Sequence, residues 1–488
     1  MGFLSTRAAS VALVIAAMMA FCSTADAAPA WAPPTTLGLT GRENGAPDVA
    51  VAPNGEAIAT WVGSRPAGIE VSSRPPGKGW SPPVTLAPVR EEVEGPQIVV
   101  SARKAVIVWT DNIHTRHGEA RVVMAATRLR GKRWGKPRNI SAEQRWRSEP
   151  SGGEPQVAIT PGGKAIVIWQ ATNEKHLAVF FIASATQAVG GTDWAAPVGI
   201  RGSFEGEAPQ VAITSAGEAV AIWGASYNEE SNIDVSSRPA KGPWKGAAQL
   251  ATPGPFPQPR LAITSKGEAI GAWVKEPEGG REATVQVTTR TPGGKWKVKT
   301  LAPQDYGIDP EIVTEPGGRA TVVWVNFPSV EEETVVASTH APGGAWSDAV
   351  SVADEGLQLP TPSESPIAVT RQGESIAVWV AESSSEKKTS IESSSRRRGQ
   401  LWSEPAKIST TPAGPLYGDP GLQLALAPDG KAFAVWRCFD GSRWVIKAVT
   451  RSPRPGTRAA RPHLAGGSAQ RPAGRVSRTS LRTLGAGR

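Results

Sequence analysis

Tryptophan recurs along the chain at nearly even intervals, and this recurrence limits the folds that the sequence can adopt. Eight tryptophans each end a short apolar run of the AVAIW type, and successive members lie 48 to 60 residues apart. Glycine lies six residues before the tryptophan in seven of the eight runs, with Arg103 as the exception. Because a repeat of this length is one small unit of secondary structure, the chain is predicted to be an array of eight such units. The first series consists of Trp61, Trp109, Trp169, Trp223, Trp273, Trp324, Trp379 and Trp436.

A second tryptophan series alternates with the first and has one member fewer inside the repeats. The missing member is Trp31, which lies before the first repeat, whereas the last repeat ends near Arg451 without reaching a second tryptophan. The two incomplete ends therefore complement each other. The second series inside the repeats consists of Trp80, Trp134, Trp194, Trp244, Trp296, Trp346 and Trp402.

Each repeat predicts four short strands, with the consensus segments PQVAIT, GEAVAIW, IDVSSR and WSxPxxL. The first two are almost continuously apolar, as is typical of strands that are buried on both faces. A sheet covered on both faces by neighbouring sheets is a blade in a ring of blades. The alternative, a string of separate β-sandwich domains, fails because a unit of about 50 residues cannot bury a core alone. We therefore predict an all-β protein, an eight-bladed β-propeller with four-stranded blades over residues 28–452. The N-terminal strand is expected to complete the last blade and so to remove the unpaired edges.

The connections between the predicted strands differ in how much their lengths vary. The turn between the first two strands is constant and has a Pro-x-Gly sequence, as at 53–55 and 428–430, in which glycine supplies a positive φ. The connection after the first-series tryptophan and the connection between repeats both vary. In an antiparallel four-stranded blade these two connections emerge on the same face, called here the variable face. Binding is expected there.

Residues 1–27 have the features of a secretory signal peptide. Arg7 is followed by an apolar run over 8–22 and by the cleavage sequence Ala25-Asp26-Ala27. We expect a secreted protein, extracellular or associated with the cell surface. A lipid anchor on Cys22 is a rival interpretation, which the bulky Phe21 disfavours. After cleavage only Cys438 remains, so no intrachain disulfide is expected.

The net charge of +9 arises at the C-terminus. From Arg451 onward the chain has nine arginines and no acid, and the body before it is close to neutral. The tail over 453–488, rich in Arg, Pro and Gly, is predicted to be disordered. It is interpreted either as weak electrostatic contact with an anionic cell surface or as a solvated end without a role. Nucleic-acid binding is not expected, because no basic patch with interleaved aromatics is apparent in the body. A monomer is expected.

The turn between the third and fourth strands resembles the Asp-box of sialidase-type (BNR-repeat) propellers, Ser/Thr-x-Asp-x-Gly-x-x-Trp. The resemblance covers about residues 30–452 and implies a turn that is structural and lies away from the active site. The Asp is absent from every copy, where Pro75, Leu129, Thr291, Ala341 and Arg397 stand instead. The matching residues are Ser73, Gly77 and Trp80; Thr127, Gly131 and Trp134; Thr289, Gly293 and Trp296; Thr339, Gly343 and Trp346; and Ser395, Gly399 and Trp402.

The resemblance to sialidases does not extend to their catalytic residues. The early Arg-Ile-Pro motif is missing, and the three tyrosines have no recognisable partner set. The arginines that end third strands, Arg74, Arg238, Arg290 and Arg396, are expected to be surface residues that stack on the constant turns. A glycosidase needs a pair of carboxylates, and no pair is singled out among the loop acids. These acids are Glu91, Glu92, Glu94, Asp111, Glu149, Glu205, Glu207, Asp309 and Asp419.

Metal and cofactor signals are weak, and neither kind of site is predicted. Asp111-x-x-His114-x-x-His117 has ligand types but is expected to lie in a solvated loop. Five aromatics outside the two series fall in the variable connections, where rings and polar groups together suit a sugar or a peptide; the alternative is that each ring packs against its own loop. The predicted ligand-binding residues are Trp146, Tyr227, Phe256, Tyr306 and Tyr417.

The predicted function is a secreted binding module, without catalysis, for an extracellular glycan or protein. Two alternatives remain open. One is a sialidase-like glycoside hydrolase that acts on polysaccharide, so that enzymatic activity is not settled by the sequence. The other is an envelope protein that its Arg-rich tail holds near the cell.

Overall fold

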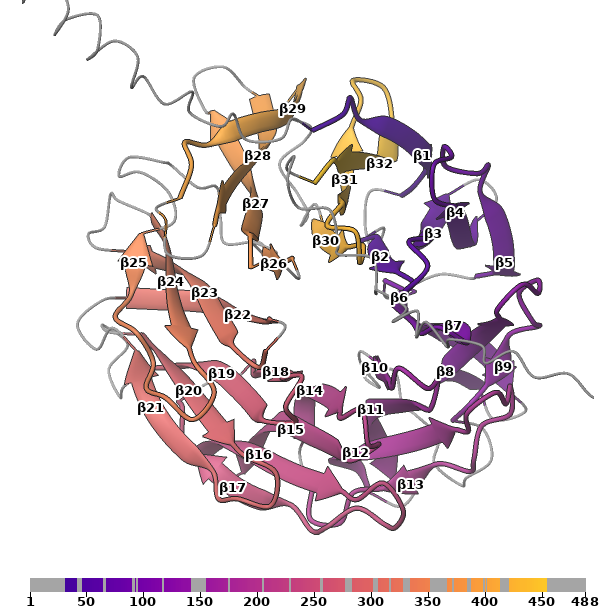
Figure 1. Ribbon diagram of the computed structural model, residues 1–488. Coiled ribbons are helices and arrows are strands. Elements are labelled where there is room, and N and C mark those ends of the chain that lie inside the picture. Colours follow the sequence, from indigo (N-terminus) through magenta and orange to yellow (C-terminus); the bar gives the residue numbers. More distant parts are fainter. Residues whose placement is uncertain are drawn as a thin grey trace, which may run out of the picture.

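The computed structural model describes residues 31–453, apart from 42–45, 65–66, 90–92, 94, 116–117, 142–154, 174–175, 204–205, 228–229, 255–257, 277–282, 302–305, 316, 328–333, 352–366, 371–372, 384–387, 398–399, 401 and 413–420. The described residues form 32 strands in eight antiparallel four-stranded sheets. The sheets are arranged in a ring, as Figure 1 shows. In the same residues no helix is long and apolar enough to cross a membrane. The predicted signal peptide and almost all of the predicted tail lie outside them.

Each blade has its first strand nearest the axis of the ring and its last strand outermost (Figure 1). Blades 1 to 4 are β2 (Asp48–Val51), β3 (Ala57–Ser64), β4 (Ala67–Arg74), β5 (Val84–Pro88); β6 (Gln97–Val100), β7 (Lys104–Thr115), β8 (Gly118–Leu129), β9 (Arg138–Asn139); β10 (Gln156–Ile159), β11 (Ala165–Asn173), β12 (His176–Gln187), β13 (Val198–Gly199); β14 (Gly206–Ile213), β15 (Ala219–Tyr227), β16 (Glu230–Arg238), β17 (Ala248–Ala251). Blades 5 to 8 are β18 (Arg260–Ile263), β19 (Ala269–Lys275), β20 (Thr284–Arg290), β21 (Lys297–Leu301); β22 (Tyr306–Thr314), β23 (Ala320–Phe327), β24 (Thr334–His340), β25 (Val350–Ser351); β26 (Ile367–Val369), β27 (Ser375–Ser383), β28 (Lys388–Arg396), β29 (Ala406–Pro412); β30 (Gln423–Leu426), β31 (Ala432–Phe439), β32 (Trp444–Arg451), β1 (Thr35–Leu39).

The N-terminal strand completes blade 8, as the complementary ends of the sequence predicted. β1 pairs antiparallel with β32, with Thr36 opposite Lys447. The pairing continues upstream, where Trp31 forms a bridge to Arg451 and the Ala32 N–H donates to the Thr450 carbonyl at 2.8 Å. The innermost strands contact one another around the whole ring, including β2 with β30. The prediction of a closed, eight-bladed propeller is therefore confirmed.

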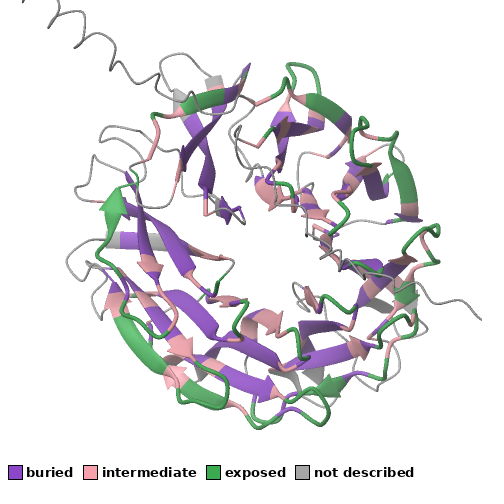
Figure 2. Cartoon of the chain, in the orientation of Figure 1, coloured by how far each residue is buried: buried purple, intermediate pink, exposed green. Residues whose placement is uncertain are grey.

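The apolar core lies between adjacent blades. Every first-series tryptophan is at most 3% exposed. Trp61 of blade 1 packs with Phe433 and Val435 of blade 8 in one cluster, and Trp109 of blade 2 packs with Ile58 of blade 1 in the next. Second-series tryptophans are mostly half-buried on the outer part of the blades. Figure 2 shows the buried middle strands and the partly exposed innermost ones. Each blade is thus stabilised mainly by its neighbours, and Cys438, the only cysteine in the described part of the chain, is free and buried in this core.

The constant turns have the geometry that their glycines predicted. Gly55 has a φ of 84° and Gly430 a φ of 87°, and the Gly55 N–H closes its turn on the Ala52 carbonyl at 2.8 Å. In three of the box turns, the serine that follows the tryptophan bonds to the backbone of the first box residue. The Ser81 hydroxyl accepts the Ser73 N–H at 3.1 Å, and Ser347 and Ser403 do the same in their own boxes.

Polar contacts join neighbouring blades at the constant-turn end. The last residue of a third strand (in blade 2 the last but one, Arg128) contacts a residue of the preceding blade, the one that follows the turn glycine or, in blade 2, Arg103. We call this contact the inter-blade link. The Ser or Thr that begins a box also takes part: Ser73 accepts a bond from Arg128 at 3.4 Å, and Ser395 accepts one from Arg451 at 3.1 Å. The links are Arg128–Glu56 at 2.9 Å, Gln187–Lys104 at 2.5 Å, Arg290–Glu218 at 2.5 Å, His340–Glu268 at 3.3 Å and Arg451–Glu374 at 2.8 Å.

These links correct part of the expectation for the arginines that end third strands. Arg290 and Arg396 do stack on turn tryptophans, with guanidinium carbons 5.4 Å and 4.9 Å from the rings of Trp296 and Trp402. They are nevertheless not free surface residues, because the Arg290 side chain is only 12% exposed and is paired with the preceding blade. The expectation failed because strand order within a repeat says nothing about the neighbouring blade.

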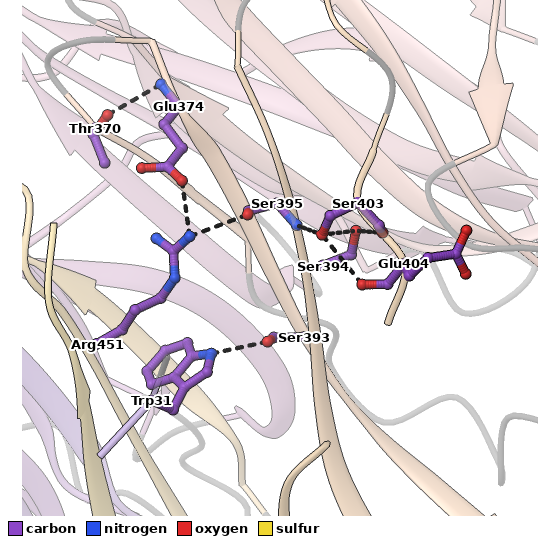
Figure 3. Close-up of polar contacts among 9 residues, drawn as sticks. All are labelled: Trp31, Thr370, Glu374, Ser393, Ser394, Ser395, Ser403, Glu404 and Arg451. Carbon is purple, nitrogen blue, oxygen red and sulfur yellow. Dashed lines mark hydrogen bonds and ion pairs between the residues drawn. The ribbon is translucent and has the colours of Figure 1, made fainter. Parts of the chain in front are cut away.

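The link that closes the ring is the most deeply buried ion pair among these contacts, with side chains 2% and 4% exposed. Arg451 of blade 8 donates to Glu374 and to Ser395 of blade 7, and the Glu374 N–H donates to Thr370 (Figure 3). Trp31 donates its indole N–H to Ser393 at 2.8 Å. Trp244 makes the equivalent bond to Ser184 in blades 4 and 3. Trp31 therefore occupies the position of a second-series tryptophan in blade 8.

One turn of the body concentrates positive charge. The turn of blade 2 over 128–137 holds five cations and no acid. Arg130 and Lys132 at its tip are exposed. The turn is inconspicuous in the sequence because the body as a whole is close to neutral.

Candidate functional site

A ring of polar side chains lies at one register position of the innermost strands, opposite the residue that precedes each first-series tryptophan. In each of the seven blades where this position is described, the residue is charged or an amide, and it is half-buried. Because the innermost strand begins where the connection between repeats ends, the ring lies at the variable face. We call this set the polar ring: Asp48, Gln97, Gln156, Gln210, Arg260, Glu311 and Gln423.

The innermost strands are partly exposed although blades flank them on both sides. All residues of β10, β18 and β30 are half-buried, whichever face of the strand they occupy. This pattern indicates that water reaches the axis of the ring, toward which these edge strands point (Figure 2). The polar ring therefore meets solvent at one end of the axis.

Asp48 ties the innermost strands of blades 1 and 2 together. Its two carboxylate oxygens accept N–H groups from Val49 and from Ile98, both at 2.7 Å. Ile98 belongs to the unpaired edge of β6, so the carboxylate satisfies a backbone donor that no strand covers. Burial raises the pKa of Asp48 to about 6, and the two N–H bonds oppose that rise.

The second carboxylate of the polar ring is Glu311 of blade 6, which pairs with Arg260 of blade 5. Their atoms Oε1 and Nε are 2.7 Å apart, and the two side chains are 29% and 24% exposed. The ion pair cancels the charge of both residues at this point of the ring. Amide groups dominate the remainder, and amides both donate and accept hydrogen bonds, as sugar hydroxyls and peptide groups require.

The predicted ligand-binding aromatics are only partly placed. Trp146, Phe256 and Tyr417 lie outside the described residues. Tyr227 is the last residue of β15 and pairs with Glu230, and Tyr306 is the first residue of β22 and pairs with Phe327. Both strand ends are at the variable face, and the binding role of the five residues stays a prediction.

The expected loop around Asp111 is instead a long hairpin. Asp111 lies in β7 opposite Val122, and His114 of the same strand lies opposite Glu119. The pairing of β7 with β8 continues to Thr115, which lies opposite Gly118, so that both strands are 12 residues long. No cluster of three metal-ligating side chains occurs among the residues that the structure describes.

Several of the predicted loop acids are not described by the structure. Glu207 lies in β14 and pairs with Gly224, and Asp309 lies within β22. The remaining ones, Glu91, Glu92, Glu94, Glu149, Glu205 and Asp419, lie outside the described residues.

The polar ring was missed in the sequence although a signal for it is present. The residue after the proline in segments of the PQVAIT type is polar in repeat after repeat. An isolated polar residue at the start of a buried strand is easily interpreted as a strand end. Only the ring arrangement brings seven such positions to one place.

The stability that Asp48 contributes is expected to fall as the pH rises from about 4 to about 7. Folding raises its pKa from 3.8 to about 6, so over this interval the folded protein holds a proton that the unfolded chain has released, and rising pH favours unfolding. The difference in free energy of unfolding between wild type and Asp48→Ala should shrink by about 1–2 kcal/mol. Urea denaturation at pH 4.5 and pH 7 measures it. A difference that grows with pH would mean that the two N–H bonds outweigh burial.

Comparisons with known proteins identify similar folds but no family. No family model matches the chain, and no curated protein matches it. One similar solved structure is a polysaccharide lyase, with 10% identity over 78% of this chain and 91% of that chain and a TM-score of 0.47. Another is the intramolecular trans-sialidase from Ruminococcus gnavus, with 12% identity over 73% of this chain and 94% of that chain and a TM-score of 0.38. A third is an α-L-arabinofuranosidase of Fusarium graminearum, with 14% identity over 64% of this chain and 96% of that chain and a TM-score of 0.37. At these values the likeness concerns the fold alone.

Proposed function

We propose that the protein is a binding module that recognises an extracellular glycan at the polar ring of the variable face. The observation that carries the proposal is the ring itself, in which seven blades each supply one polar side chain at the end of a solvent-accessible axis. Amide groups that donate and accept hydrogen bonds in fixed positions suit sugar hydroxyls. The strand ends that carry Tyr227 and Tyr306 lie at the same face.

A glycan array with the full-length secreted chain tests this proposal. The double variant Gln156→Ala/Gln210→Ala removes amides from two adjacent blades and should weaken binding of each bound glycan about tenfold or more. Gln249→Ala, which removes an exposed amide from the outermost strand of blade 4, is the matched control and should bind as wild type does. Equal binding by both variants, or binding only to proteins, would contradict the proposal.

A second candidate function, hydrolysis of a polysaccharide, is favoured by the raised pKa of Asp48. A carboxyl group with a pKa of about 6 is suited to act as a general acid. A glycosidase also needs a second carboxylate nearby, and Glu311 in the polar ring is held by Arg260. Release of reducing ends from a polysaccharide panel at pH 5–6, abolished in Asp48→Asn, would favour hydrolysis. Binding without release would favour the binding module.

We also propose that the protein is exported. The sequence of residues 1–27 supports this proposal, with Ala25-Asp26-Ala27 as the cleavage site. N-terminal sequencing of the mature protein should begin at Ala28. A mature N-terminus at Met1 would contradict export by cleavage.

A further inference from the structure

The end of the blades opposite the polar ring carries a pocket between blades 1 and 2. Its volume is about 360 Å³, near the lower limit for small-ligand sites. The constant turn of blade 1, the constant turn of blade 2 and the box turn of blade 2 form its walls. The lining includes Asn54, Glu56, Ser101, Arg128, Arg130 and Lys132.

Part of the charge in this pocket is already used by the fold. Arg128 pairs with Glu56 at 2.9 Å and stacks on Trp134, with its guanidinium carbon 5.4 Å from the ring centroid. Lys104 also lines the pocket, but its ammonium group is bonded to blade 3, where it donates to Gln187 at 2.5 Å and to the Ala188 carbonyl at 2.8 Å. These contacts engage the charges of Arg128 and Lys104, and they leave Arg130 and Lys132 as the cations available to a ligand.

Arg130 and Lys132 are held in place by their own backbone. They belong to a tight turn in which Gly131 has a φ of 71° and the Lys132 N–H donates to the Leu129 carbonyl at 2.9 Å. The Arg130 N–H donates to the Arg103 carbonyl of the neighbouring turn at 2.8 Å. Both side chains are exposed, and neither has an acidic partner among the described residues. The turn therefore presents two charges from a rigid base.

We propose that this pocket binds an acidic polysaccharide, with one carboxylate or sulfate group of the chain placed between Arg130 and Lys132. The lining has a surplus of positive charge, so an anion is favoured. The amide of Asn54 and the hydroxyl of Ser101 offer hydrogen bonds to sugar hydroxyls beside it. The lining has no aromatic side chain on which a base would stack, which disfavours single-stranded nucleic acid. This site is separate from the polar ring, and it does not depend on the proposed function.

Calorimetry with the full-length chain tests the proposal, using a galacturonate trimer and a sulfated hexasaccharide as probes. Arg130→Gln/Lys132→Gln should weaken both affinities about tenfold or more. Lys241→Gln/Lys245→Gln removes two exposed lysines from the corresponding turn between the third and fourth strands of blade 4 and its flank, and should change both affinities by less than about twofold. The Arg-rich tail is the same in all proteins, so it does not contribute to the difference. An uncharged maltohexaose should not bind here.

Three results would overturn the proposal. The first is an equal loss in the two double variants, because binding would then follow the overall charge of the face. The second is the absence of binding to either acidic oligosaccharide. The third is tighter binding of inorganic sulfate or of a single-stranded oligonucleotide than of both acidic sugars. The same measurement distinguishes this pocket from the polar ring, because Gln156→Ala/Gln210→Ala should leave the affinity for the acidic probes unchanged.

Discussion

Arg451→Ala is expected to lower the free energy of unfolding by about 3–5 kcal/mol. The side chains of Arg451 and Glu374 are 2% and 4% exposed, so removal of the arginine leaves a buried carboxylate without its main cationic partner. The lost pair also joins the last blade to the one before it, at the place where the ring is closed by the N-terminal segment (Figure 3). Urea denaturation followed by tryptophan fluorescence measures the change.

The matched control for this prediction is Arg128→Ala, at the equivalent link between blades 1 and 2. Arg128 and Glu56 are 18% and 21% exposed, so water can solvate the glutamate that remains, and a loss of about 1 kcal/mol is expected. A double-mutant cycle of Arg451→Ala with Glu374→Ala should show strong coupling. Losses of similar size at both links would mean that burial does not set the strength of these contacts.

Trp223→Ala is expected to lower the free energy of unfolding by about 3–5 kcal/mol. Trp223 is fully buried and packs with Ile166, Ile168 and Ile182 of blade 3. Its removal leaves a cavity between two blades, and sheets that are hydrogen-bonded within themselves cannot easily move together to fill it. Thermal and urea denaturation measure the loss.

Trp134→Ala provides the comparison, because Trp134 belongs to the second series and is half-buried. A loss of about 1–2 kcal/mol is expected there, part of it from the lost stacking with Arg128. If the second-series variant is destabilised as strongly as Trp223→Ala, the core is not located between the blades at the first-series positions, and the packing account is wrong.

The sequence was sufficient to predict the propeller, because its eight repeats can be compared with one another. The position of Trp31 before the first repeat predicted closure by the N-terminal strand, and its bond to Ser393 matches the bond of Trp244 to Ser184. The positive φ of the turn glycines followed from their fixed distance to the tryptophans. Each of these predictions rests on local geometry or on apolar burial, which a repeated pattern records well.

The links between blades were not predicted from sequence, because they join residues of different repeats. Glu218 and Arg290 are 72 positions apart, and from the sequence each of them would be taken for an ordinary surface charge. Only the ring brings the end of one third strand beside the turn of the blade before it. The polar ring was missed for the same reason, since its members come together only around the axis.

The candidate ligand-binding aromatics present a different difficulty. Trp146, Phe256 and Tyr417 lie in connections whose length and sequence differ from one repeat to the next, so no internal comparison constrains them. Their chemistry could be recognised from sequence, but their mutual positions could not. The polar ring, fixed by the innermost strands, gives the variable face a defined chemistry that does not depend on those connections.

The two ends of the blades thus differ in chemistry. The variable face carries a ring dominated by amides around the axis, whereas the constant-turn face carries a basic pocket between blades 1 and 2. The two proposals therefore assign a neutral glycan and an acidic one to separate places on the molecule. Both sites require blades fixed in their order around a closed ring.

Closure of the ring within one chain is the central claim, and an engineered cross-link tests it most directly. Thr36 lies opposite Lys447 in the pair formed by β1 and β32, where the Cβ atoms of opposed residues are close enough for a disulfide. In a Cys438→Ser background, Thr36→Cys/Lys447→Cys should oxidise to a monomer whose proteolytic peptides are joined. Thr35→Cys/Lys447→Cys places the thiols on opposite faces and should stay reduced. A disulfide that joins two chains, or none in the first variant, would contradict a ring closed by its own N-terminal strand.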